Sequence, residues 1–176
     1  MAKVPKGWKD AGAGEEQIDH ILYDSQLSTT AANTKLNMFK QTEAANGLKL
    51  TNMTKANELP TSQRMLIKKI TVFFNDVPAG VDIENLLDKA VCEFLINNKR
   101  VMAAPMRMFL HESTVLPAGA TQDEQEAIGK SLELDNYIVL PGGVNFTFDL
   151  STGDTVAGTT TNITVAFTGE LVRSVI

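Results

Sequence analysis

Residues 144–150 read VNFTFDL and residues 163–176 read ITVAFTGELVRSVI, and these two stretches decide the fold class. From Val144 to Leu150 every second residue is apolar and the residues between are polar, which is the pattern of a strand with one buried face. The second stretch alternates in the same way as far as Gly169, where the glycine predicts a bulge or a bend. The C-terminal third of the chain is therefore predicted to form antiparallel sheet.

Strand patterns also occur upstream, separated by turn signals such as the PGG at 141–143. Asn97-Asn98 predicts a tight hairpin, because asparagine tolerates positive φ. Short strands are expected around 36–38 and 48–51, and a long polar loop from 111 to about 136.

About eight strand patterns occur without an alternation of strands and helices, so the expected fold is all-β. The specific expectation is an antiparallel, eight-stranded single jelly roll, which is a form of β-sandwich. One short helix is expected near 82–90, where Asp82 can cap a segment with one apolar face.

The segment 64–74, RMLIKKITVFF, is apolar on both strand parities. A strand covered on one side only would alternate cleanly, so its second face is expected to contact another element or a neighbouring subunit. Met65, Ile67 and Phe73 share one parity and are candidate subunit-interface residues.

The N-terminal residues 1–27 are predicted to be a flexible arm, followed by a single domain over 28–176. Within the arm, Ile18, Ile21 and Leu22 have the i, i+3, i+4 spacing of a short amphipathic helix. These three residues complete the candidate interface, because such a helix could dock on a neighbouring subunit.

Composition excludes several classes of protein. The chain has 176 residues, 43% of them hydrophobic and 21% charged, which is the composition of a globular domain. No apolar run approaches the ~20 residues that span a bilayer, and no secretory signal is expected, so the chain is expected to be made in a cytoplasm. The net charge of −5 predicts no specific nucleic-acid binding.

The sequence offers few groups for catalysis. Its two histidines are His20 and His111, without the paired spacing of metal-binding jelly rolls, and Cys92 lies in an apolar run that predicts a buried thiol. The acidic residues at 123–126 lack ordered ligand spacing. We therefore predict no catalytic residues, no cofactor, no metal site and no enzymatic activity.

The turn LPGG (140–143), the strand VNFTFDL and the closing ITVAFTGELVRSVI resemble the last strands of jelly-roll coat proteins of tailless icosahedral bacteriophages, of the corticovirus, tectivirus and sphaerolipovirus kind. The run ELPTSQRMLIKKITVFF (58–74) and the hairpin CEFLINNKRV (92–101) are similar in layout to their early strands.

The resemblance implies a capsid protein of the virion that assembles with copies of itself, with other capsid proteins, or with both. An internal membrane beneath the shell would follow by analogy only. The alternative function is a β-sandwich module that binds carbohydrate or a receptor, such as a virion spike or vertex domain.

Overall fold

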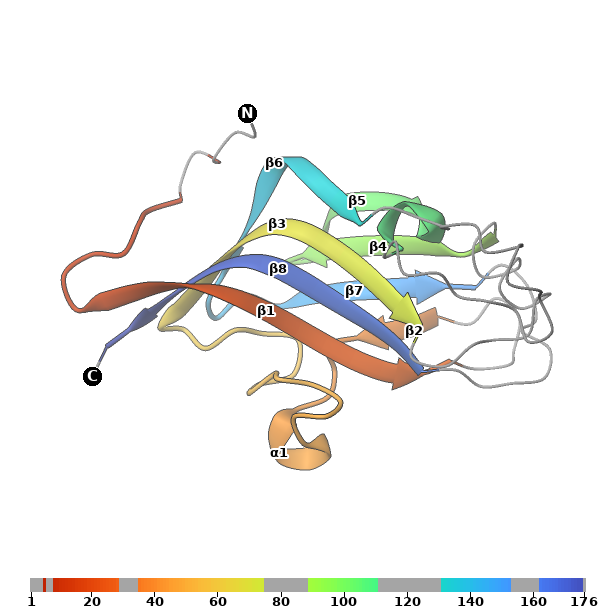
Figure 1. Cartoon of the computed structure of the whole chain (residues 1–176), viewed down its shortest axis with the longest axis horizontal. Coiled ribbons are helices and arrows are strands. Elements are labelled where there is room, and N and C mark those ends of the chain that lie inside the picture. Colours follow the sequence, from red (N-terminus) through yellow and green to blue (C-terminus); the bar gives the residue numbers. More distant parts are fainter. Residues whose placement is uncertain are drawn as a thin grey trace, which may run out of the picture.

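The computed structural model describes residues 5, 8–28, 35–74, 89–110, 131–152 and 162–175. Within these residues the strands form two four-stranded antiparallel sheets, so the predicted all-β sandwich class is confirmed (Figure 1). The elements are β1 Glu15–Leu27, β2 Lys35–Met38, α1 Glu43–Asn46, β3 Gln63–Phe74, β4 Val91–Ile96, β5 Lys99–Pro105, the 3₁₀ helix η1 Met106–Phe109, β6 Leu132–Pro141, β7 Phe146–Ser151 and β8 Asn162–Ser174.

The strands pair as nested partners. β4 pairs with β5, β3 with β6, β2 with β7 and β1 with β8, all antiparallel. Two further pairings, β3 with β8 and β4 with β7, join these pairs edge to edge. The first sheet has the order β1-β8-β3-β6 and the second sheet the order β2-β7-β4-β5.

The predicted hairpin at Asn97-Asn98 is confirmed. Both asparagines have positive φ, 50° and 60°, the signature of a type I′ turn between β4 and β5. The PGG turn has a different role, because it carries the chain from β6 in the first sheet to β7 in the second. Gly142 is required there, since a Cβ would overlap the carbonyl oxygens of Pro60 and Gln63.

The irregularity predicted at Gly169 is a bulge in the facing strand β3. Gly169 pairs with Ile67 and the preceding residue of β8, Thr168, pairs with Lys69, so Lys68 is an extra residue. A Cβ at Gly169 would overlap the Leu66 carbonyl oxygen, which is why glycine stands here. The bulge reverses the parity of β3, so that odd positions before it and even positions after it face inward.

The core between the sheets is rich in aromatic rings. Phe167 lies at its centre, with ring centroids 4.6 Å from Phe39, 5.1 Å from Phe94 and 5.7 Å from Phe148. All four rings are fully buried. Burial of aromatic side chains at this density is the main favourable contribution to the stability of the sandwich.

The helix expected within 15–27 is wrong. These residues form β1, which pairs over 13 positions with β8, so they belong to the first sheet and not to a flexible arm. The physical reason is that the apolar spacing has the helical period, but pairing with β8 satisfies the backbone groups of the whole segment and outweighs this local preference.

Two other expectations need correction, and a third falls mostly on residues that the structure does not describe. Residues 48–50 form a turn followed by an isolated bridge at Thr51, where a short strand was expected. The expected polar loop ends early, because 132–136 already belong to β6. Most of the helix expected near 82–90 lies outside the described residues.

Candidate subunit interface

The three candidate residues of β1 point to opposite sides of the first sheet. Ile18 packs partly buried against the core and Leu22 is buried in it, whereas the side chain of Ile21 is 52% exposed. A helix would have put all three on one face, but a strand alternates. Ile21 alone of the three therefore remains available to another molecule.

The three candidates of β3 are divided by the bulge. Met65 and Ile67 are fully buried in the core, together with Ile70 on the other side of the bulge. The apolar residues on both parities thus follow mainly from the reversal of parity, with Leu66 the one fully buried apolar residue of β3 on the outward parity. The interface prediction is wrong for Met65 and Ile67. Phe73 is half-buried and faces outward.

Ile21 and Phe73 meet in a shallow hollow of about 330 Å³ on the outward side of the first sheet. The strands β1, β8 and β3, which carry most of its lining, lie side by side in Figure 1. We call this surface the sheet-face patch; it comprises Ile21, Tyr23, Ser25, Lys49, Thr71, Phe73, Thr164, Ala166 and Thr168.

The patch is built from cross-strand pairs of β1 and β8. Ile21 lies opposite Thr168, and Tyr23 lies opposite Ala166. At the next outward level the hydroxyls of Ser25 and Thr164 are 2.6 Å apart and share a hydrogen bond. Apolar and hydroxyl side chains thus make up the patch, and Lys49 is its one charged residue.

The segment 48–52 protects the outer edge of β1 beside the patch. Leu50 accepts a hydrogen bond from the backbone N–H of Ser25 at 2.8 Å. The side chain of Asn52 accepts from the N–H of Tyr23 at 2.9 Å and donates to the carbonyl of Ile21 at 2.7 Å. Because these backbone groups are satisfied, this stretch of edge is not a template for adding another strand.

The other end of the same sheet face is charged. Arg64 donates to both carboxylate oxygens of Glu15, at 2.8 and 2.9 Å. These hydrogen bonds, with a further one from the Gly12 N–H, lower the pKa of Glu15 to about 2. Lys68, the extra residue of the bulge, forms an ion pair with Glu170. Along its length the face therefore changes from a region of ion pairs to the patch, which has Lys49 as its one charged residue.

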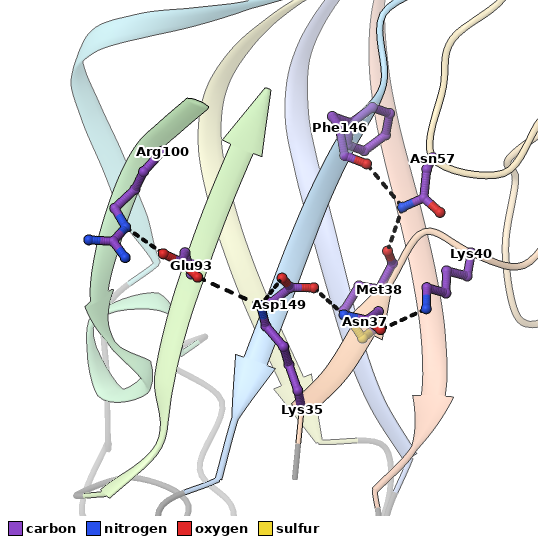
Figure 2. A network of polar contacts seen from close by, with 9 residues as sticks. All are labelled: Lys35, Asn37, Met38, Lys40, Asn57, Glu93, Arg100, Phe146 and Asp149. Carbon is purple, nitrogen blue, oxygen red and sulfur yellow. Dashed lines mark hydrogen bonds and ion pairs between the residues drawn. The ribbon is translucent and has the colours of Figure 1, made fainter. Parts of the chain in front are cut away.

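The outward side of the second sheet is ionic along its width (Figure 2). Glu93 and Asp149 lie directly opposite each other on β4 and β7, a repulsive arrangement for two carboxylates. Lys35 compensates, with its Nζ 2.6 Å from Asp149 and 3.8 Å from Glu93. Arg100 forms an ion pair with Glu93, and Asn37 donates to Asp149. This surface satisfies its own charges and is suited to water.

The two lateral edges of the sandwich also differ. On the β1/β2 side the buried carboxylate of Asp24 accepts hydrogen bonds from the Phe39 N–H at 2.7 Å and from Gln26 at 2.9 Å. Gln26 also donates to the carbonyl of Asn37 at 2.6 Å, so the two sheets are joined here. Burial raises the pKa of Asp24.

The β5/β6 side is open. β6 departs from β3 between Glu133 and Ile138, and a groove of about 820 Å³ runs between β5 and β6. Its lining is largely apolar and includes Ile96, Val101, Met102, Met108, Leu132, Leu134 and Ile138.

The groups that could serve catalysis are dispersed. Cys92 is buried in the core, and burial raises the pKa of its thiol, which makes it unreactive. Burial, with the nearby charge of Arg173, lowers the pKa of His20. Among the described residues no three His, Cys, Asp or Glu side chains come together to hold a metal ion, and His111 lies outside them.

Comparison of the chain with protein-family models, with curated proteins and with solved structures found no match. None of the helices in the described part of the chain has the length and apolarity needed to span a bilayer.

Proposed function

We propose that the sandwich is a single jelly roll and that the chain is a structural protein of a viral capsid. The nested strand pairing supports the first part. A jelly roll is a long antiparallel hairpin rolled up so that its successive strand pairs alternate between two sheets. The proposal is supported by the pairs β1/β8, β2/β7, β3/β6 and β4/β5 and by the orders β1-β8-β3-β6 and β2-β7-β4-β5.

The sheet-face patch is the observation that carries the second part. Function must be argued from a site, because jelly rolls serve many functions. One broad face of this sandwich is closed by its own ion pairs, whereas the other carries a hollow of apolar and hydroxyl side chains with Ile21 half exposed at its rim. Surfaces depleted of charge and centred on apolar and aromatic residues are typical of protein interfaces.

In this proposal the chain functions by assembling, with copies of itself, with other capsid proteins, or with both, into the icosahedral shell of a virion. It acts without a cofactor and catalyses no reaction. The resemblance of its closing strands to phage coat proteins and the mainly apolar and hydroxyl patch support the same conclusion from different observations.

The test is the mass of the purified protein in solution, measured by light scattering over a concentration series, with electron microscopy of the largest species. We expect defined oligomers or closed particles. Ile21→Lys should reduce them, because it adds a charge to the patch. Val91→Lys is the matched control, since Val91 is a β-branched residue 43% exposed on the second sheet, and it should assemble like the wild type.

A wild-type chain that stays monomeric at every concentration, alone and with the other proteins of its virion, would contradict the proposal. It would instead favour the carbohydrate- or receptor-binding module. Equal assembly of the wild type and Ile21→Lys would place the contact surface elsewhere.

A further inference from the structure

We propose that the sheet-face patch pairs with the same patch of a second copy around a two-fold axis, with Lys49 of each copy facing Asp19 of the other. The inference rests on the proposed role as an assembling subunit and adds the partner and the geometry of this surface. It is carried by the positions of two opposite charges at the two ends of the patch.

Asp19 lies on β1, two residues before Ile21, so its side chain leaves the same outward face. It is exposed, forms no salt bridge with another described residue, and lies directly opposite Glu170, so that with Lys68, the ion-pair partner of Glu170, this end of the patch keeps a net negative charge. At ~3.4 Å per residue it stands about 7 Å from Ile21 along the strand.

Lys49 marks the opposite end of the patch. It is exposed, lines the hollow, and likewise forms no salt bridge within the described part of the chain. Its neighbour Leu50 is hydrogen-bonded to Ser25, so Lys49 lies at the level of Ser25 along β1. The centre between Asp19 and Ser25 on β1 is Leu22.

A two-fold axis parallel to the plane of the sheet and perpendicular to the strands, lying above the outward face at the level of Leu22 on β1, exchanges these ends. It brings Ile21 of one copy over Tyr23 of the other, and Lys49 over the level of Asp19, twice in each pair. Such an interface is isologous, and each apolar contact is flanked by opposite charges. Face-to-face packing of two sheets with nearly aligned strands is a common arrangement.

The charges make a sharp test. Lys49→Asp gives a copy with acidic groups at both ends of the patch, and Asp19→Lys gives a copy with basic groups at both ends. Each variant alone juxtaposes like charges, and we expect its self-association, measured by sedimentation velocity at low salt, to weaken at least about tenfold. An equimolar mixture of the two should associate again as mixed pairs, because every contact is then between opposite charges.

The double variant, Lys49→Asp with Asp19→Lys in one chain, should also recover association. Both residues are exposed, so circular dichroism should show each variant folded like the wild type. High salt should reduce the differences among all four proteins.

The outcomes separate this inference from the proposed function. If the wild type assembles, and the single variants assemble equally well or the mixture recovers nothing, the two-fold pairing is wrong while the subunit role stands. If the wild type assembles with neither itself nor other capsid proteins, both are wrong.

Discussion

Replacement of Gly169 by alanine tests the bulge that sets the parity of β3. A Cβ at this position would overlap the carbonyl oxygen of Leu66 and lie 2.9 Å from its carbonyl carbon and 3.2 Å from the Cα of Ile67. Ordinary carbon contacts are ~3.5–4.0 Å, and all these atoms belong to backbone that cannot rotate away. The two strands must therefore separate.

The cost can be worked from what that separation breaks. Two ladder hydrogen bonds beside the bulge, at about 0.5–1.5 kcal/mol each, would be lost or stretched. Met65 and Ile67, both fully buried, would lose part of their packing. We expect the free energy of unfolding to fall by about 2–4 kcal/mol.

The assay is urea unfolding of the unassembled chain, monitored by circular dichroism. A shift of the urea midpoint, with an unchanged dependence of the unfolding free energy on urea concentration, measures the change in stability. Gly12→Ala is the control, because the added Cβ would make only an ordinary 3.6 Å contact with Glu15, and it should change stability by less than about 0.5 kcal/mol. A Gly169→Ala midpoint equal to that of the wild type would refute the bulge and the inward direction of Met65 and Ile67 that depends on it.

Three further predictions follow from the edges and the second sheet. Burial raises the pKa of Asp24, so its contribution to stability is largest at low pH and declines as the pH rises through the folded-state pKa. In thermal melts from pH 3 to 8, Asp24→Asn should therefore gain stability relative to the wild type as the pH rises. A difference in stability that stays constant with pH would contradict this. Deletion of 1–27 removes β1, so the product should lack a cooperative unfolding transition, whereas a folded product would show that β1 is dispensable. Lys35→Met removes the cation beside Asp149, whose side chain is 5% exposed and lies opposite Glu93. The free energy of unfolding in urea should fall by about 1–2 kcal/mol. An unchanged midpoint would argue against the ion pair between Lys35 and Asp149.

The sequence predicts the fold class well where a strand shows its own pattern. β7 and β8 alternate cleanly, and Asn97-Asn98 needs only its own side chains to form the turn. The failure at β1 has a physical cause. Its inward face carries Asp24 and Gln26, whose partners are the backbone of Phe39, just after β2, and of Asn37 on β2. Such partners are contributed by tertiary structure, so the strand has no apolar alternation of its own.

The candidate interface was predictable only in part for a similar reason. Phe73 and Ile21 were named and do face outward, but Met65 and Ile67 were misassigned because one inserted residue, Lys68, reverses the parity of β3. The signal for that bulge lay in the partner strand, at Gly169. Tyr23, Lys49 and Ala166 were missed, since the patch joins β1 to a turn residue at position 49 and to β8, which comes more than 100 residues later.

The nested pairing also sets when the patch can exist during synthesis. The β4–β5 hairpin can close as soon as its turn is made, but β1 waits for β8, whose residues 162–174 are made more than 130 residues later. Because β8 is the middle strand of the patch, a growing chain on the ribosome has no complete sheet face to offer its neighbours. If the chain assembles through this face as proposed, nascent chains on one messenger RNA are kept from premature association until both sheets are complete.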